Sequence, residues 1–337
     1  MDGSEAEAPA AYASARDATT GPAADGGGSR PVRLVDHMTS IYNALLALIW
    51  LCLIPQWSYS VWLALAHAAA ALLPKLLART RGKLSPAGRV LADIYPLIFI
   101  LAFWTELDLV RRLLHDSSFD RVIAGLDLAV FGVHLDQVWL PAMPWLWFSE
   151  IMHFAYFSYY FAVILPLLYM ALRGSAEMKR DMTFRVMLVY LACFFIYIAF
   201  PVDGPHFLSH HYEGPHQAGF FYKLDEVLQG QGDALGCSFP SSHVAATTTM
   251  AYLGIRWLSK PAAVLLVLSA VGVALSTFYA QHHYAIDSLA GIILALWLQL
   301  LVAPALLRWW RCYRLTAAAD GRSLSPPLPP PAAPPSR

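Results

Sequence analysis

Residues 261–279 read PAAVLLVLSAVGVALSTFY, a run without a charged side chain. A helix needs about 20 apolar residues to cross the ~30 Å hydrocarbon layer of a bilayer, so this run predicts a membrane-spanning helix. Other runs of similar length and composition lie on both sides of it. We therefore predict an all-α fold, a polytopic transmembrane bundle of about eight spans, at residues 38–55, 59–78, 89–107, 147–171, 184–201, 241–258, 261–279 and 284–307.

The composition of the 337-residue chain agrees with a membrane protein. Hydrophobic residues make up 58% and charged residues 14%, against roughly 25% charged in a soluble globular chain. The 23 basic and 23 acidic residues give a net charge of zero, which argues against a nucleic-acid partner because such proteins carry a basic face. The four cysteines are far apart and form neither a disulfide framework nor a zinc ribbon.

The basic residues between the spans predict the orientation. They cluster in four places: Arg79, Arg81, Lys83 and Arg89; Arg173, Lys179, Arg180 and Arg185; Arg256 and Lys260; and Arg308, Arg311 and Arg314. Basic clusters collect on the cytoplasmic side, and eight spans bring all four clusters to one side. We therefore expect both tails in the cytoplasm and two segments on the other side, at 108–144 and 201–240. Alternating apolar and charged residues in 108–144 predict short interfacial helices.

The two ends of the chain differ from the apolar middle. Residues 1–35 are rich in Ala and Gly without an apolar period, and residues 315–337 are rich in proline, so both predict disordered tails. Residues 36–146 hold the leading spans with the interfacial helices. Residues 147–310 form the predicted catalytic core.

Two short motifs carry the chemistry. One is GCSFPSSH at 236–243, where the sixth span begins, and the other is STFYAQHHYAID at 276–287, between the last two spans. Because both lie at the same predicted outer face, they can converge on one site. His283 and Asp287 are four residues apart and would share a helix face, so that the carboxylate orients the imidazole as a nucleophile. Ser241 or Ser238 is expected to cap the helix that follows Pro240, whose first amides would bind an anion such as phosphate.

The two motifs resemble the second and third motifs of the type 2 phosphatidic acid phosphatase superfamily, over roughly residues 147–307. Pro240, Ser241 and His243 match its Pro-Ser-Gly-His motif, and Ser276, His283 and Asp287 match Ser-Arg-x5-His-x3-Asp. The resemblance implies a six-helix core in which His283 accepts the phosphoryl group, Asp287 assists it and His243 is the general acid. No metal or cofactor is expected, because helix-end amides and neighbouring donors stabilise the charge. Around these three catalytic residues we assign the following to substrate binding: Ser241, Ser242, His206, Ser276 and His282.

The sequence departs from the family pattern where phosphate is usually bound. Thr277 stands where the third motif has Arg, and no Lys-x6-Arg-Pro motif precedes the outer loop, which holds FPVDGPHF at 200–207 instead. A similar loss, together with a His-His-Tyr third motif, is typical of the branch resembling inositol phosphorylceramide synthase. That resemblance implies a lipid phosphate donor and a lipid alcohol acceptor, with lipid or polyprenyl (di)phosphate hydrolysis as the alternative.

Several other polar residues have two interpretations. One interpretation is that the missing phosphate-binding cations are replaced by His206, His210, His211 or Lys223. The other is that these four are ordinary loop residues. Glu150 and His153 line a headgroup pocket or form a satisfied pair between helices. Tyr156, Tyr159 and Tyr160 are interpreted as packing residues, and His67 as a hydrogen-bonded histidine inside the bundle.

Two other classes of function remain open. His243, His282, His283 and Asp287 are all potential metal ligands, but adjacent His282 and His283 point to different helix faces and no His-x-x-x-His pair is present. Charged groups inside several spans would indicate a channel, transporter or scaffold, whereas here the ionisable groups gather at one face of the membrane. The sequence predicts neither the membrane nor the oligomeric state.

Overall fold

The computed structural model describes residues 32–80, 83–209, 211–232 and 234–319. Within these residues the fold is helical, and a single isolated parallel bridge between Val202 and Cys237 is the only β-type pairing. The all-α prediction is therefore confirmed. Most of the two predicted tails lies outside the described residues. The tail boundary at 315 was wrong, because the last helix continues to Ala319.

The chain forms the following elements: α1 Leu34–Cys52, α2 Ser60–Thr80, α3 Pro86–Leu114, α4 Asp120–Phe131, α5 Leu135–Ala142, α6 Leu146–Arg173, α7 Ala176–Ala199, α8 Pro205–Leu208, the 3-10 turn η4 Pro215–Ala218, α9 Phe220–Gly232, α10 Ser242–Trp257, α11 Lys260–Tyr279, α12 Ala285–Trp297, the π-helical turn η5 Leu298–Val302 and α13 Ala303–Ala319. Serine caps open several of them. Ser85, Ser175 and Ser241 each accept a backbone N–H three residues ahead, as the sequence pattern at a helix start predicts.

Seven of these helices are long and apolar enough to cross a membrane: α1, α2, α3, α6, α7, α11 and the continuous α12–η5–α13. Helix α10 corresponds to the predicted span at 241–258, but its 16 residues fall short of that length. The short helices expected in 108–144 are α4 and α5, which meet at a 60° bend and would count together as a further span. The chain is thus a multi-pass membrane protein.

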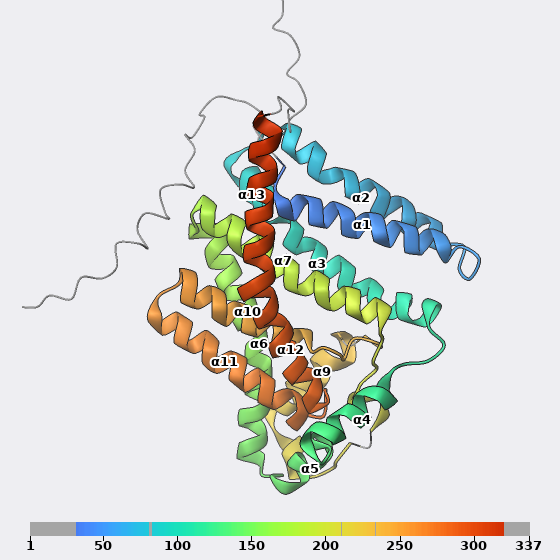
Figure 1. Cartoon of the computed structure of the whole chain (residues 1–337). Coiled ribbons are helices and arrows are strands. Elements are labelled where there is room, and N and C mark those ends of the chain that lie inside the picture. The colour runs from blue at the N-terminus through green and yellow to red at the C-terminus, as the bar shows by residue number, and fades with distance from the viewer. Residues whose placement is uncertain (1–31, 81–82, 210, 233, 320–337) are drawn as a thin grey trace, which may run out of the picture.

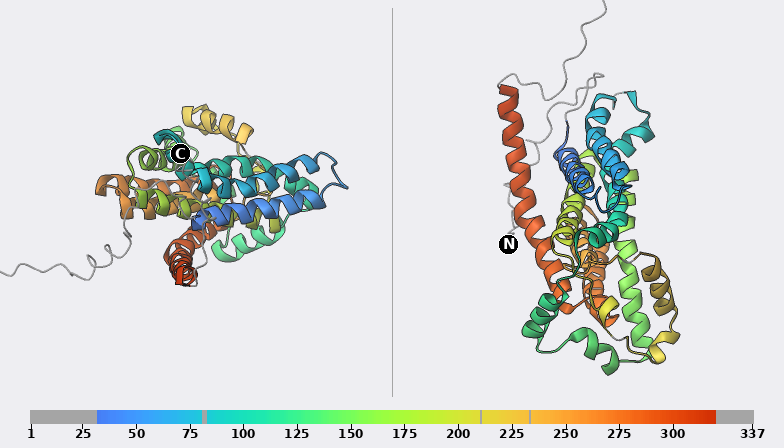
Figure 2. Two further views of the ribbon diagram at one scale, coloured as in Figure 1. Left: turned by 90° about the horizontal axis from the view of Figure 1, so that it is seen from above. Right: turned by 90° about the vertical axis from the view of Figure 1, so that its right-hand side faces the viewer.

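Helix α10 lies at the centre of the bundle and packs against α6, α7, α11 and α12. Helices α1 and α2 form a hairpin at one edge, and α4 and α5 lie at the opposite end, beside the start of α12 (Figure 1, Figure 2). Two glycines permit the close packing of α10. A Cβ on Gly291 would lie 2.7 Å from the Ser241 carbonyl oxygen, and one on Gly254 would lie 2.6 Å from a Leu266 methyl group.

The leading helices are joined by a buried polar cluster. His67 on α2 bonds Asn43 of α1 through Nδ1 (2.9 Å) and Glu106 of α3 through Nε2 (2.8 Å). The Trp50 indole N–H donates to the same Glu106 carboxylate at 2.8 Å. Polar groups in an apolar environment need such partners. The interpretation of His67 as a hydrogen-bonded histidine in the bundle is confirmed.

A second buried cluster fixes the N-terminal half of α7. The Arg185 guanidinium donates to Asp181 (2.8 Å) and to the Gln299 backbone carbonyl (2.9 Å). Gln299 lies in η5, where the π-helical turn changes the helical hydrogen-bond pattern. Arg256 at the end of α10 also donates to Asp181. These bonds connect α7, α10 and α12–α13 at the end remote from His283.

Candidate active site

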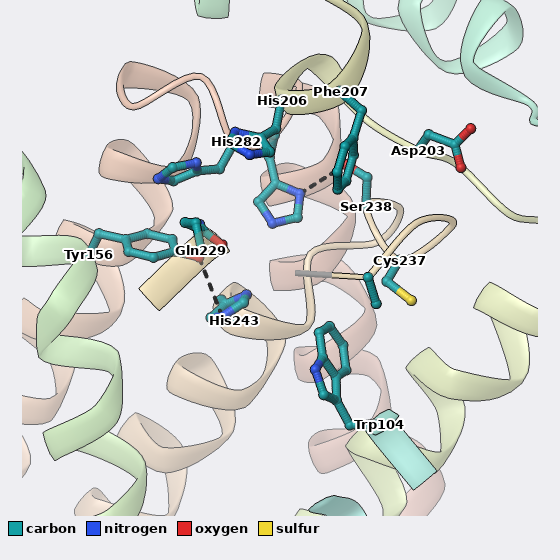
Figure 3. A pocket seen from close by; sticks show the side chains of 12 residues that line it. Trp104, Tyr156, Asp203, His206, Phe207, Gln229, Cys237, Ser238, His243 and His282 are labelled. Atoms are coloured by element: carbon teal, nitrogen blue, oxygen red, sulfur yellow. Dashed lines mark hydrogen bonds between the residues drawn. The ribbon is translucent and has the colours of Figure 1, made fainter. Parts of the chain in front are cut away.

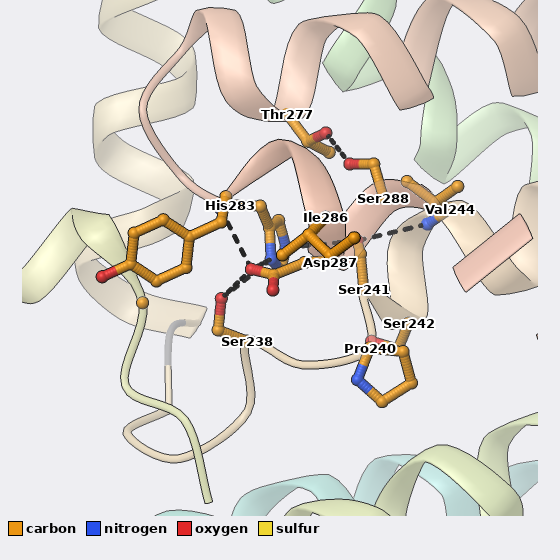
Figure 4. A network of polar contacts seen from close by, with 12 residues as sticks. Ser238, Pro240, Ser241, Ser242, Val244, Thr277, His283, Ile286, Asp287 and Ser288 are labelled. Atoms are coloured by element: carbon orange, nitrogen blue, oxygen red, sulfur yellow. Dashed lines mark hydrogen bonds and ion pairs between the residues drawn. The ribbon is translucent and has the colours of Figure 1, made fainter. Parts of the chain in front are cut away.

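Nδ1 of His283 lies in a buried three-residue network (Figure 4). The Ser238 hydroxyl donates to Asp287 Oδ2 at 2.7 Å and lies 3.1 Å from His283 Nδ1, whereas the direct distance from Nδ1 to Asp287 Oδ2 is 3.4 Å. Because Ser238 has one proton and gives it to a carboxylate, its oxygen accepts from Nδ1–H. That tautomer leaves the lone pair on Nε2, so Nε2 is the ring nitrogen that could act as a nucleophile.

The local backbone differs from the expected helix face. His283 lies in the loop before α12, and only Asp287 lies on the helix, at its third position. Asp287 Oδ2 also accepts the Tyr284 backbone N–H at 3.0 Å, so the carboxylate caps its own helix and approaches His283 from there. The expectation that both share one helix face was wrong, although the two side chains do meet.

His243, near the start of α10 (Figure 3), lines a small pocket together with His283. The two ring centroids are 6.2 Å apart. His243 Nε2 lies 3.4 Å from the Tyr156 hydroxyl, which accepts from the Gln229 side chain at 2.9 Å. The Tyr159 ring packs against the same imidazole, with centroids 4.3 Å apart. The two motifs thus converge on one pocket, which both imidazoles line.

The serines assigned to substrate binding have different environments. The Ser241 hydroxyl lies 3.2 Å from His283 Nε2 and caps α10 at Val244 N. Ser242 is buried, and its backbone N–H donates to the Tyr197 hydroxyl at 3.0 Å. The amides at the start of α10 are thus largely bonded within the protein, contrary to the expected open anion site. Ser276 is fully buried and donates to the carbonyl of Val273 on its own helix, away from the pocket.

His282 lies on the other side of the pocket and is paired with an acid from α9. Its Nε2 is 2.7 Å from Asp225 Oδ2, and His153 Nε2 lies 3.9 Å from the same oxygen. Burial raises the pKa of Asp225 and lowers the pKa of His282, so burial favours the uncharged form of both groups. His282 Nδ1 is buried without a hydrogen-bond partner.

His206 completes the pocket wall on that side. Its ring lies 5.5 Å from that of His282, and it lines the pocket together with His243 and His283 (Figure 3). Burial, with further contributions from His282 and His211, lowers the pKa of His206 to about 4. The imidazole is therefore neutral at pH 7, and a bound anion would favour its protonation.

The described residues that line the pocket include neither lysine nor arginine: Trp104, Tyr156, Asp203, His206, Phe207, Gln229, Ala234, Cys237, Ser238, His243, His282 and His283. Thr277, in place of the family arginine, is fully buried and bonds Ser288 at 2.6 Å, joining α11 to α12. Arg111 of α3 comes near, but its guanidinium pairs with Asp203 (3.0 Å) and donates to the His115 carbonyl. The basic side chains among these described lining residues are thus all imidazoles.

The remaining polar candidates lie outside the pocket. Glu150 accepts the backbone N–H groups of Phe221 and Tyr222 and so caps α9 rather than pairing with His153. His211 is exposed and bonds the His206 carbonyl, Lys223 is exposed, and His210 lies outside the described residues.

Comparison with known proteins shows the family of this chain. The family model for the PAP2 superfamily matches residues 126–301, slightly more than half of the chain. The chain belongs to the PAP2 superfamily. Its members are phosphatases or phosphotransferases that act on lipid phosphates, so the chain is an enzyme of this kind. No curated protein and no solved structure matches the chain.

Sequence reasoning missed four residues of this PAP2 site. Tyr156, interpreted as packing, touches His243, and Ser238, considered only as a cap, bridges the His283–Asp287 pair. Asp225 and Gln229 were not considered. Their i, i+4 spacing in an amphipathic segment was the available signal, because it places both on one face of α9.

Proposed function

We propose that this PAP2 enzyme transfers a phosphorylated headgroup from a lipid phosphodiester to an alcohol through a phosphohistidine on His283. The observation that carries the proposal is the pair of imidazoles, His243 and His283, on either side of one pocket with Ser238 and Asp287 behind the nucleophile. Water as the acceptor would make the same chemistry a hydrolysis of the lipid phosphate ester.

The first step forms the covalent intermediate. His283 Nε2 attacks phosphorus, and the bond between phosphorus and the lipid alcohol oxygen breaks. His243 gives its proton to the departing alkoxide. Asp287 and Ser238 stabilise the positive charge that develops on the His283 ring, because both accept, directly or through the hydroxyl, from Nδ1–H.

The second step reverses these roles. His243 takes the proton of the acceptor hydroxyl, the acceptor oxygen attacks phosphorus, and the phosphorus–nitrogen bond breaks. His243 is then protonated again, so the cycle needs no net proton. Tyr156 holds Nε2 of His243 at the pocket through its hydroxyl.

The pocket favours a phosphodiester over a phosphate monoester. A diester carries one negative charge and a monoester close to two near neutral pH, while neither lysine nor arginine is among the described lining residues. His206 would compensate that single charge by taking up a proton, and His282 would donate a hydrogen bond to the phosphodiester from Nδ1. Ser241 lies near the attacking nitrogen. This charge argument supports the branch resembling inositol phosphorylceramide synthase. The basic clusters support an extracytoplasmic site with both tails in the cytoplasm.

The test is lipid mass spectrometry on vesicles that contain the purified protein and a phosphodiester donor, with and without a lipid alcohol. We expect acceptor-dependent transfer product and none with His283→Ala. Base quenching should trap a labelled phosphohistidine in the wild type that His283→Ala lacks. Phosphorylated headgroup released equally without acceptor would make the protein a hydrolase of lipid phosphodiesters. Normal turnover by His283→Ala would refute the mechanism.

A further inference from the structure

The bend between α4 and α5 holds a compact group of metal-ligand side chains. Asp127 near the end of α4, His134 before α5 and Asp136 in its first turn each offer one ligand atom, and these atoms lie within 4.8 Å of one another. Figure 1 shows the two helices at the end of the bundle where α12 begins, away from α1 and α2. None of the three residues lines the catalytic pocket.

The two carboxylates at this bend are buried without a cation. Asp127 and Asp136 are 0% and 1% exposed, and neither forms an ion pair with a lysine or arginine in the part of the chain that the structure describes. Asp136 Oδ2 accepts from the Gln137 amide, but Oδ1 is buried and has no hydrogen-bond partner. Buried carboxylates are costly unless a cation or donors compensate them, and no lysine or arginine among the described residues does so here; the half-exposed His134 imidazole lies beside Asp127.

We propose that Asp127, His134 and Asp136 bind a divalent transition-metal ion, of the Zn²⁺ or Mn²⁺ type. Two carboxylates and an imidazole are ligands that such ions accept. His134 Nδ1 lies 3.3 Å from Asp127 Oδ2, which is long for a hydrogen bond. It equals the distance of about 3.3 Å between two ligands at ~2.0–2.1 Å from a tetrahedral zinc ion. The His134 side chain is 36% exposed, which provides a route of entry from solvent.

The proposed metal site is connected to the catalytic loop. Asp127 Oδ1 accepts the backbone N–H of Ile286, the residue before Asp287, at 2.9 Å. On the other helix, the Trp139 ring packs edge-on against Tyr279 at 5.6 Å, just before the loop that carries His282 and His283. A metal ion at the bend would therefore hold α4 and α5 together against both ends of that loop.

Metal content of the full-length, untagged protein in detergent tests the proposal. After chelator treatment and dialysis, the protein is titrated with ZnCl₂ or MnCl₂ by calorimetry, and its metal is counted by mass spectrometry. We expect about one tightly bound ion per chain and a higher Tm with metal than without. Asp136→Asn and His134→Gln should each weaken this binding at least tenfold, since even loss of an outer partner of a metal site costs about 10–100-fold. His134→Gln changes a half-exposed side chain, so it should keep the fold.

The matched control is Asp116→Asn, which removes an exposed acid between α3 and α4 and should leave metal binding unchanged. Equal metal binding by wild type and both site variants would place the ion elsewhere, for instance at His206 and His211, and overturn the proposal. Wild-type protein without a stoichiometric ion would overturn it as well. An Asp136→Asn protein as stable as the metal-loaded wild type would show that the bend holds a shared proton instead.

Discussion

Replacing Ser238 with alanine tests how His283 is oriented. The direct distance between His283 Nδ1 and Asp287 Oδ2 is 3.4 Å, too long for a strong hydrogen bond, and the Ser238 hydroxyl completes the connection with contacts of 3.1 and 2.7 Å. A hydrogen bond to a charged group contributes about 1.5–3 kcal/mol. If that energy stabilises the imidazolium in the transition state, kcat falls roughly 10- to 150-fold.

The assay is initial-rate transfer in vesicles at saturating donor, with circular dichroism and thermal melting to verify the fold. We expect KM to change much less than kcat, because Ser238 acts behind the nucleophile. The variant should accumulate phosphohistidine more slowly in single-turnover experiments. A Ser238→Ala enzyme with kcat within twofold of the wild type would refute the bridging role and show that Asp287 orients His283 directly.

Further predictions follow from the same geometry. Gly204→Ala should lower kcat, because at φ +87° its Cβ would lie 2.6 Å from the Ser238 hydroxyl, whereas Gly230→Ala, with open space on α9, should leave transfer rates unchanged. Asp225→Asn should raise KM about fivefold with a smaller effect on kcat, since it weakens a hydrogen bond of about 1 kcal/mol to His282; an unchanged KM would contradict a headgroup role for that pair. The His206 imidazole has a pKa of about 4 and should take up a proton as the phosphodiester binds. Wild-type KM should therefore rise with pH above 4, by up to tenfold per unit, until the pKa in the complex is reached, and His206→Gln should flatten this profile. Ser276→Ala should keep at least half of the wild-type kcat/KM in the same assay, because its hydroxyl bonds its own helix.

Much of the fold could be predicted from the sequence because membrane insertion depends on local apolar length. Each of the eight predicted spans corresponds to a helix, and only α10 is shorter than expected. It can be short because it is surrounded by α6, α7, α11 and α12. The end of α13 was misplaced, since helix extension beyond the apolar run left no hydropathy signal.

The meeting of His243 and His283 at one pocket could be predicted from the sequence because the two residues lie in two short motifs. The geometry within the motifs could not. The i, i+4 argument for His283 and Asp287 assumed a helix that begins only at Ala285, and the loop conformation made room for Ser238 between them. Ser276 belongs to a matching motif, yet its position on α11 points its hydroxyl into the helix.

The sequence by itself therefore determined that this is a membrane-embedded helical protein. It also determined which two segments carry the paired histidines His243 and His283, because hydropathy and motif spacing are local properties. Only the tertiary structure decided which side chains complete the site. Tyr156 and Asp225 come from α6 and α9, and Asp127 reaches the catalytic loop from α4. Such contacts depend on the packing of helices distant in sequence, and no single segment encodes them.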